Sequence, residues 1–248
     1  MSNRIVIIPT YNEKENIAEI ILKVISLDPV FHILIVDDNS PDGTADIVKS
    51  FQSKHSERLH LLQRPGKNGL GTAYIAGFRW CIEKKYDYIF EMDADFSHNP
   101  DDLVKLYNAC KDDKADVAIG SRYVTGVNVV NWPMSRVIMS YYASAYVRFI
   151  TGMSIRDATA GFVCYTRKAL ETFDLDKIKF KGYAFQIEMK FKAWKFGLRL
   201  TEVPIIFTDR TLGTSKMSKK IFREAFFGVI ELKLKSMFSK PSINKSIN

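Results

Sequence analysis

The sequence contains no long uncharged apolar stretch. No run of about 18 apolar residues free of charge occurs anywhere in the chain, so we expect no transmembrane helix. The apolar run at residues 5–8 ends at Pro9, which makes it too short for the hydrophobic region of a secretory signal. These two absences predict a cytoplasmic protein without a signal peptide.

Cysteine is also scarce. The three cysteines, Cys81, Cys110 and Cys164, form no C-x-x-C pair, and their odd number does not fit a disulfide framework. We therefore expect buried thiols in a reducing compartment. The sequence also lacks an internal repeat, a low-complexity tract and a linker, and 248 residues suffice for one large core. We predict a single domain at residues 1–240 and a flexible tail at residues 241–248.

Positive charge is in excess, with a formal net charge of +8, and it is concentrated near the C-terminus. Between Lys216 and Lys240 lie seven basic and two acidic residues. A basic segment of this kind can contact nucleic acid, an anionic membrane surface or a phosphorylated substrate. We expect no nucleic-acid partner, because the chain has no recognisable RNA- or DNA-binding motif.

Short β-rich runs alternate with helical patterns along the first half of the chain. We expect strands at residues 4–8, 32–36, 59–63, 88–92 and 116–120, and helices at residues 13–26, 44–51, 71–83 and 100–110. This alternation predicts an α/β fold with a mostly parallel central sheet flanked by helices. In the less regular second half we expect helices at residues 133–151, 185–196 and 219–238, and strands at residues 158–165 and 199–207.

Acidic pairs follow two of the predicted strands. Asp37-Asp38 follows the second strand, and Asp93-Ala94-Asp95 follows the fourth. Ligands of parallel sheets bind beyond the carboxyl ends of the strands. Two carboxylates at i and i+2 on an extended segment point to the same side, where their mutual repulsion favours a bound cation. A divalent metal that also binds substrate phosphates would suit a nucleotide-sugar enzyme, although D-A-D alone fits a solvated turn equally well.

Further motifs occur in order along the chain. They are I-P-T-Y-N-E at residues 8–13, V-D-D-N-S-P-D-G-T at 36–44, G-L-G-T-A-Y at 69–74, M-D-A-D-F-S-H at 92–98, G-S-R-Y at 120–123, Q-I-E-M at 186–189 and D-R-x-x-G-x-S-K at 209–216. In these motifs the chain resembles the dolichol-phosphate mannosyltransferases (polyprenyl-phosphate mannose synthases) of the inverting GT-A glycosyltransferase family 2. The resemblance runs from about Arg4 to Phe227 and implies a GT-A, Rossmann-like nucleotide-sugar fold.

The resemblance implies where the donor binds. The family's first nucleotide-binding loop is matched by Pro9, Tyr11 and Glu13. The acidic pair that contacts base and ribose is matched by Asp37 and Asp38, and Ile35, just before them, is expected to line the base pocket. The D-x-D segment of Asp93, Ala94 and Asp95 is expected to contact the diphosphate, with both carboxylates on Mg²⁺ or Mn²⁺. Some relatives have glutamine where this chain has Ser97, so residue 97 is not counted as a metal ligand.

The resemblance also assigns basic residues to the phosphates. Arg122, Arg210 and Lys216 match basic positions there, and Arg136 is a further candidate for the acceptor phosphate. We expect Asp95, Arg122 and Arg210 to be catalytic. Glu188, in Q-I-E-M, either binds substrate or is an ordinary surface carboxylate.

The reaction implied is transfer of mannose from GDP-mannose to a polyprenyl (dolichyl) monophosphate, giving a β-linked mannosyl phosphate by one inverting displacement. A phosphate monoester has a second pKa of about 6, so its oxygen is already largely anionic and no strong general base is required. A UDP-glucose donor, or another reaction of family 2, is the alternative. A nucleotidyltransferase is disfavoured, because the N-terminal loop is P-T-Y-N-E and not a Gly-rich triphosphate loop.

An isoprenoid acceptor lies in a membrane, so the enzyme must meet it there. The basic segment at residues 216–240 is predicted to form an amphipathic helix that, with residues 131–149, attaches the protein peripherally to the cytoplasmic membrane face. Ordinary packing of this helix on the sheet is the competing interpretation. Many relatives of the implied family carry transmembrane helices; without one, the chain would dock directly or through a small membrane-anchoring partner.

Overall fold

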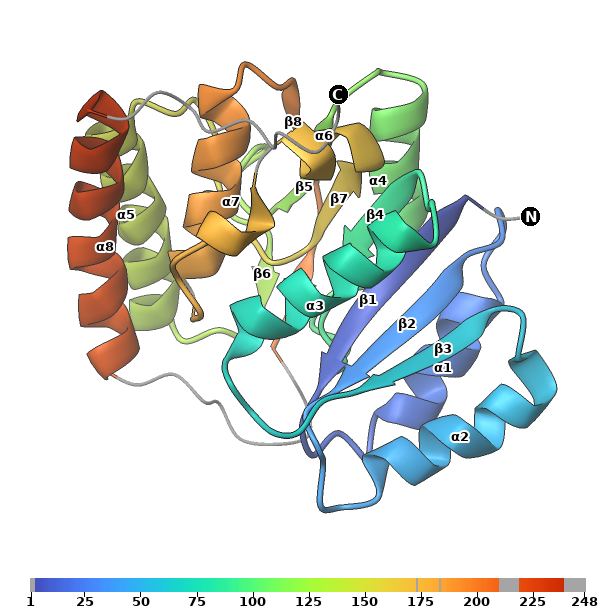
Figure 1. Ribbon diagram of the computed structural model, residues 1–248. Helices are drawn as coiled ribbons and strands as arrows, with labels where there is room; N and C mark the ends of the chain where they lie inside the picture. Colours follow the sequence, from blue (N-terminus) through green and yellow to red (C-terminus); the bar gives the residue numbers. More distant parts are fainter. Residues whose placement is uncertain (1–2, 173, 183, 210–218, 239–248) are drawn as a thin grey trace.

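The computed structural model describes residues 3–172, 174–182, 184–209 and 219–238. A seven-stranded sheet runs through the molecule in the order β3-β2-β1-β4-β7-β5-β8, and β6 and β9 form a small second sheet (Figure 1). The strands are β1 (Arg4–Thr10), β2 (His32–Asp37), β3 (Leu59–Gln63), β4 (Tyr88–Glu91), β5 (Val117–Ser121), β6 (Val129–Val130), β7 (Val163–Thr166), β8 (Leu200–Pro204) and β9 (Phe207–Thr208). The helices are α1 (Ile17–Ile25), α2 (Thr44–His55), α3 (Leu70–Glu83), α4 (Asp102–Lys111), α5 (Met134–Thr151), α6 (Arg167–Thr172), α7 (Ala184–Lys195) and α8 (Lys219–Phe238), with a 3₁₀ turn η1 at Leu175–Lys177.

The main sheet is mostly parallel, which confirms the prediction. β1 pairs in parallel with β2 and β4, β2 with β3, and β5 with β8. β7 lies between β4 and β5 and is antiparallel to both. The central residues of β1 and β2 read I-V-I-I and I-L-I-V, and such continuous apolar runs are typical of strands with both faces buried.

Helices cover both faces of this sheet (Figure 1). Successive strand residues point to opposite faces. Val6 and Ile33 therefore belong to a core cluster with α1, α2 and α4, whereas Ile7 and Leu34 belong to a second cluster with α3, α6 and α7. This α/β layering places the carboxyl ends of β1, β2 and β4 at one edge of the sheet.

Helices α5 and α8 form a further layer at one end of the molecule, at the left of Figure 1. They pack with α7 through a third cluster that includes Val147, Ile187 and Val229. The Tyr146 hydroxyl donates a hydrogen bond of 2.9 Å to the Phe226 carbonyl oxygen, and the two rings stack at 4.6 Å. Within the described residues, no helix is both long enough and apolar enough to cross a bilayer.

Three predicted elements differ most from the observed ones. The strand expected at residues 158–165 begins only at Val163, as β7, because the residues before it form a turn in which the Ala160 amide donates to the Asp157 carbonyl oxygen at 3.3 Å. The strand expected at residues 199–207 is divided into β8, which ends at Pro204, and β9, which pairs with β6 instead. Proline has no amide hydrogen with which to continue a ladder. The helix expected at residues 13–26 begins only at Ile17, because side chains of the S-P-D-G-T motif hold the preceding residues in a loop.

The two glycines of G-L-G-T-A-Y serve backbone geometry. Gly69 has a φ of +103°, and a Cβ atom there would lie 2.9 Å from the Lys181 carbonyl oxygen. At Gly71 a Cβ atom would lie 2.7 Å from the Phe185 ring. Gly69 therefore allows the start of α3 to approach Lys181, and Gly71 allows it to approach the first turn of α7.

Candidate active site

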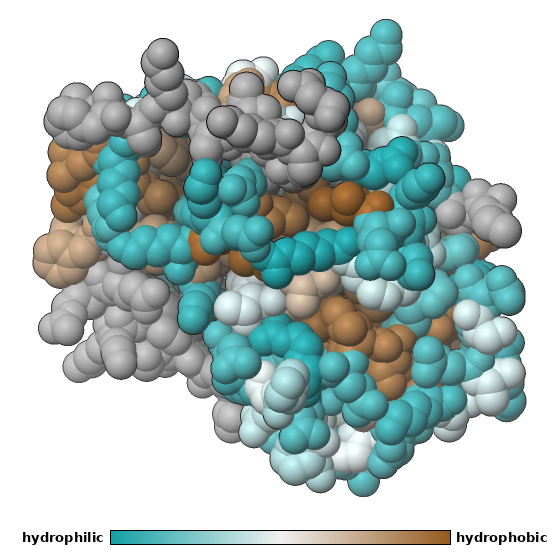
Figure 2. Space-filling model, in the orientation of Figure 1, coloured by the Kyte–Doolittle hydropathy of each residue, from teal (hydrophilic) through white to brown (hydrophobic). Residues whose placement is uncertain are grey.

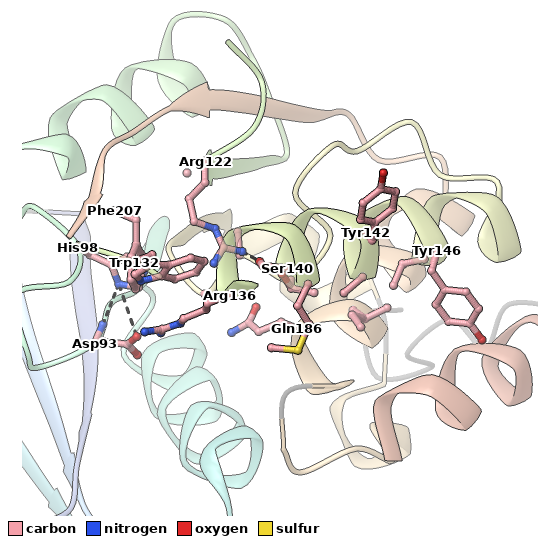
Figure 3. A pocket seen from close by; sticks show the side chains of 18 of the residues that line it. Asp93, His98, Arg122, Trp132, Arg136, Ser140, Tyr142, Tyr146, Gln186 and Phe207 are labelled. Atoms are coloured by element: carbon pink, nitrogen blue, oxygen red, sulfur yellow. Dashed lines mark hydrogen bonds and ion pairs between the residues drawn. The ribbon is translucent and has the colours of Figure 1, made fainter. Parts of the chain in front are cut away.

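The candidate active site is a cavity of about 430 Å³ that extends from the end of β4 to α5 and α8 (Figure 3). Its charged lining residues are Asp93, Arg122 and Arg136. Its opposite end is apolar and is lined by Tyr142, Tyr146, Val147, Phe226 and Val229. The cavity can therefore hold a ligand with one anionic end and one apolar end.

Asp37 has an architectural role at the end of β2. Its side chain is fully buried and accepts hydrogen bonds from Thr10 Oγ1 at 2.9 Å and from the amide and hydroxyl of Ser40 at 3.0 and 2.6 Å. The neighbouring Asp38 forms an ion pair with Arg64, with 3.1 Å between Arg64 Nε and Asp38 Oδ1. Burial raises the pKa of Asp38, although the charge of Arg64 opposes this effect. Of the two predicted contacts, Asp38 is thus the better candidate to meet a nucleotide.

The S-P-D-G-T motif holds the P-T-Y-N-E loop in place. The backbone amides of Asn12, Glu13 and Lys14 each donate a hydrogen bond of 3.1 Å to side-chain oxygens of this motif. The acceptors are Ser40 Oγ, Thr44 Oγ1 and Asp42 Oδ2. The two motifs, far apart in the sequence, therefore form one rigid loop pair beside the ends of β1 and β2.

Tyr11 in this loop faces a cation from another segment. The Lys67 Nζ atom lies 4.6 Å from the centre of the Tyr11 ring, and Pro9 and Glu13 are both partly exposed nearby in the chain. Ile35, expected at the base pocket, instead has no exposed surface and packs in the core with α1. None of these residues predicted to bind the nucleotide lines the cavity itself; those with exposed surface lie on the loop, whereas Ile35 is in the buried strand.

The D-x-D segment is held by the residues that follow it. Asp95 is buried, and its Oδ1 accepts hydrogen bonds from the Ser97 amide and hydroxyl at 3.1 and 2.5 Å. The Asp93 amide donates to His98 Nδ1 at 3.3 Å, while the Asp93 side chain remains 39% exposed at the cavity. Ala94 is buried between them. Ser97, which sequence reasoning left without a role, thus positions Asp95.

The donor atoms of this segment fit a hard divalent cation. Carboxylate oxygens are the ligands that Mg²⁺ and Mn²⁺ prefer, and such ions commonly take their remaining ligands from water and substrate phosphates. Within the described residues, no group of three or more His, Cys, Asp or Glu side chains is arranged to hold a metal. Asp93 and Asp95 would therefore supply two ligands of a site that the substrate completes.

His98 is buried beneath the D-x-D segment and stacks on Phe162 with 4.9 Å between ring centres. Burial lowers the pKa of His98 to about 4; the charge of Asp95 opposes this and that of Arg122 adds to it. Its Nδ1, the acceptor of the Asp93 amide hydrogen, therefore belongs to a neutral ring. The burial of His98 was not predictable from the sequence, because a single histidine carries no pattern that indicates it.

The lowered pKa of His98 predicts an acid-sensitive fold. The unfolded chain binds a proton near pH 6.5 and the folded chain only near pH 4, so the stability contributed by the neutral ring is complete above pH 6.5 and is lost as pH falls toward 4. Wild type should therefore lose about 3 kcal/mol more of its free energy of unfolding over this pH range than His98→Gln does. Urea unfolding of metal-free wild type and metal-free His98→Gln between about pH 7 and pH 4 measures this difference. An equal dependence of the unfolding free energy on pH in the two proteins would contradict the lowered pKa of His98.

Arg122 is fixed at the cavity by a buried carboxylate. Its Nε and Nη2 atoms donate to Asp157 at 2.7 and 2.6 Å, and Nη2 also donates to Thr159 Oγ1 at 2.9 Å. Burial opposes ionisation of Asp157, but the charge and hydrogen bonds of Arg122 outweigh it and hold the pKa of Asp157 below its usual range. Sequence reasoning missed Asp157, because a single acid in R-D-A-T-A-G carries no recognisable spacing.

Arg136, in the first turn of α5, also lines the cavity. Its Nη1 donates to both carboxylate oxygens of Asp209 at 2.9 Å. Ser140, one helical turn later, lines the same cavity and was not predicted. The predicted phosphate contacts Arg210 and Lys216 lie outside the described residues.

Glu188 does not line the cavity, in contrast to the predicted substrate contact. Its Oε2 accepts hydrogen bonds of 2.9 Å from the backbone amides of Lys179 and Phe180, and its Oε1 lies 3.3 Å from Lys192 Nζ. Glu188 therefore stabilises the segment before α7. It is buried for this structural reason and is not a surface carboxylate either.

The neighbouring Gln186 is the residue of Q-I-E-M that faces the cavity. Its Nε2 donates to Glu91 at 2.9 Å, and its Oε1 accepts from Lys190 at 3.2 Å. Lys190 also donates to the Ala160 carbonyl oxygen at 2.6 Å. Burial raises the pKa of Glu91 and lowers that of Lys190, while their attraction opposes both shifts. This buried network joins β4, α7 and the Arg122-anchoring segment.

Comparison with known proteins places the chain among glycosyl transferases. Residues 5–174 match the family model described as Glycosyl transferase family 2. Polyprenol monophosphomannose synthase of Mycolicibacterium smegmatis is 48% identical over 227 residues, which cover 92% of this chain and 85% of that protein. Undecaprenyl-phosphate mannosyltransferase of Micrococcus luteus is 46% identical over 223 residues, which cover 90% of each chain.

A solved structure confirms the predicted fold class. The mannosyltransferase PcManGT of Pyrobaculum calidifontis, in complex with GDP-Man and Mn²⁺, matches with a TM-score of 0.59 at 16% identity. The match covers 97% of this chain and 66% of that one. At this identity the likeness concerns the GT-A fold.

Proposed function

Because this chain belongs to glycosyl transferase family 2, we propose that it transfers mannose from GDP-mannose to the phosphate of a polyprenyl phosphate. The two relatives described above carry names that describe this acceptor class and this sugar, and they align along nearly the whole chain. The guanosine nucleotide is supported by the earlier motif resemblance and by the GDP-Man of the structural neighbour.

The two-ended cavity is the observation that carries the proposal. A polyprenyl phosphate has an anionic head and an apolar chain. Arg122 and Arg136 line the end beside Asp93, and Tyr142 and Tyr146 lead from there to the apolar end between α5 and α8 (Figure 3). Guanidinium groups match phosphate oxygens, so the head would lie at the arginines and the isoprenoid would leave along the paired helices.

The charged lining suits an acceptor that brings its own nucleophilic charge. Asp93 belongs to the predicted metal-binding segment, and burial lowers the pKa of His98 to about 4, which makes His98 a weak base. The anionic phosphate oxygen itself would therefore attack the anomeric carbon. The bond from that carbon to the nucleoside diphosphate breaks as the new bond forms, which inverts the centre. Positioning by Arg122 and Arg136 would supply much of the rate.

Charge on the leaving diphosphate must also be neutralised. When bound at Asp93 and Asp95, Mg²⁺ or Mn²⁺ would stabilise that developing charge. Asp38, Arg64 and Lys67 surround the nucleotide end and would fix the donor. Arg210 and Lys216 remain predicted phosphate contacts.

We also infer that the α5–α8 layer is the membrane-facing surface. Exposed large apolar side chains gather on it, and Figure 2 shows a brown area over these helices. They are Met134, Ile138, Met139, Tyr141, Tyr142 and Phe149 on α5 and Phe226, Phe227 and Leu234 on α8. The apolar end of the cavity lies between the same helices, so lipid could pass directly from the membrane into the site. A small membrane-anchoring partner remains a prediction.

Membrane binding should depend on two of these rings. Phe149 and Phe227 are 86% and 62% exposed, and their joint replacement by serine should lower binding to anionic lipid vesicles by about tenfold or more. Vesicle flotation measures the bound fraction. Leu22→Ser, at a half-exposed position on α1, is the matched control and should bind as wild type does. Equal binding of the double variant and the control would contradict a membrane role for this surface.

Transfer of labelled sugar tests the proposed function. GDP-mannose and UDP-glucose are supplied separately with a short polyprenyl phosphate in detergent, with and without Mn²⁺. We expect metal-dependent label in the lipid fraction from GDP-mannose alone. Label from UDP-glucose alone would keep the acceptor and change the donor, whereas no lipid product from either donor would contradict the acceptor assignment.

A further inference from the structure

Trp132 lies at the centre of the charged end of the cavity (Figure 3). It precedes Pro133, the residue before α5, in a segment fixed by the pairing of β6 with β9. Two backbone hydrogen bonds of 3.0 Å reinforce that pairing, from the Phe207 amide to Asn128 and from the Asp209 amide to Val130. The indole is therefore held by the backbone and by the Phe207 ring, whose centre is 5.2 Å away.

Both phosphate-binding arginines lie against this one ring. Arg136 Cζ is 4.0 Å from the ring centre of Trp132, and Arg122 Cζ is 5.4 Å from it. The electron-rich face of an indole attracts guanidinium groups. Two cations in the same region otherwise repel each other before an anionic ligand arrives. The ring thus adds to the two carboxylate partners, Asp157 and Asp209, in offsetting the repulsion between the groups that would bind one phosphate.

Each arginine is anchored on another side by a carboxylate, Arg122 by Asp157 and Arg136 by Asp209. These anchors come from separate segments of the chain. Arg122 Cζ also lies 5.3 Å from the ring centre of Tyr123 and 5.6 Å from that of Phe207. Among the described residues, Trp132 is the ring that contacts both arginines, and it therefore links the position of one guanidinium to that of the other.

The indole nitrogen does not explain the presence of tryptophan. Trp132 Nε1 is buried and has no hydrogen-bond acceptor among the described residues. A buried donor without an acceptor is unfavourable, so the position must benefit from the ring itself. Ordinary packing against Phe207 is the competing explanation, and an aliphatic side chain of similar size would satisfy it.

We propose that Trp132 is a positioning residue whose ring aligns Arg122 and Arg136 for the acceptor phosphate. This inference rests on the proposed function of the cavity. It predicts that an aromatic ring is required at this position, that the indole N–H is not, and that the defect concerns the acceptor and not the donor.

Three proteins test this proposal: wild type, Trp132→Phe and Trp132→Leu. We expect Trp132→Leu to raise the acceptor KM about tenfold or more, with the donor KM changed by less than about twofold. Trp132→Phe retains a ring without the N–H and should stay within about threefold of wild type for both substrates. Calorimetric binding of a short polyprenyl phosphate, which needs no turnover, should show the same order of affinities.

The outcomes separate this inference from the proposed function. Unchanged acceptor binding in Trp132→Leu, or an equal loss in Trp132→Phe, would overturn the role of the ring. Parallel increases in donor and acceptor KM would indicate a merely structural role and would overturn it as well. Wild-type protein that binds the acceptor but makes no mannosyl lipid would refute the proposed function, while the binding series still decides the role of Trp132; absence of acceptor binding in wild type would overturn both.

Discussion

Replacement of Asp95 by asparagine is expected to lower kcat by about 10³-fold while the protein stays folded. Asparagine keeps the Oδ1 acceptor that the Ser97 amide and hydroxyl use, so the loop should retain its shape. It removes the charge that would bind the metal and, through it, the leaving diphosphate. Steady-state kcat with GDP-mannose and a short acceptor, together with calorimetric titration of Mn²⁺, measures both effects.

A control for this prediction is Asp46→Asn. Asp46 is an exposed acid on α2 whose ion pair with Lys49 lies at the surface, so the variant should match wild type in kcat and in Mn²⁺ affinity. An Asp95→Asn enzyme with near-normal turnover would remove the basis for the metal assignment.

Asp157→Asn is expected to destabilise the fold and to impair catalysis together. The carboxylate is fully buried and holds the Arg122 guanidinium through two charge-assisted hydrogen bonds. Loss of its charge removes the carboxylate that balances a buried cation at 2.6–2.7 Å, which should lower the free energy of unfolding by about 3–5 kcal/mol. Because Arg122 would also be displaced from the acceptor phosphate, kcat/KM should fall by about 10²-fold or more. Urea unfolding and steady-state kinetics provide the two measurements.

The chain contains a matched pair for comparison. Asp87 and Arg167 are also 2.6 Å apart, but their side chains are 45% and 32% exposed and lie at the opposite end of β4. Asp87→Asn should therefore cost no more than about 1 kcal/mol and leave kinetics unchanged. Similar losses in both variants would show that burial of the Arg122 pair has no special importance.

The fold of the first half was predictable because its signals are local. Continuous apolar runs such as those of β1 and β2, separated by amphipathic helices, determine strands and their parallel order without knowledge of distant contacts. The position of β7 was not predictable in this way. Its residues read as a strand, but its insertion between β4 and β5 depends on pairings over long sequence distances.

The site shows the same division between local and distant information. Asp93 and Asp95 could be recognised from their spacing at the end of a strand, and Arg122 from its motif. The anchor of Arg122 could not, because Asp157 acquires its role only when the fold brings it within 2.7 Å of the guanidinium. Q-I-E-M drew notice for Glu188, yet the direction of α7 turns Gln186 toward the cavity and Glu188 toward backbone amides.

The most direct test compares two acceptors that differ only in the phosphate. Purified enzyme with GDP-mannose and Mn²⁺ is offered a short polyprenyl phosphate or the corresponding polyprenol, and mannosylated lipid is quantified. The proposed mechanism predicts product from the phosphate alone, since the cavity provides arginines for an anionic nucleophile and the acceptor supplies its own charge. Mannosylation of the alcohol at a comparable rate would contradict it.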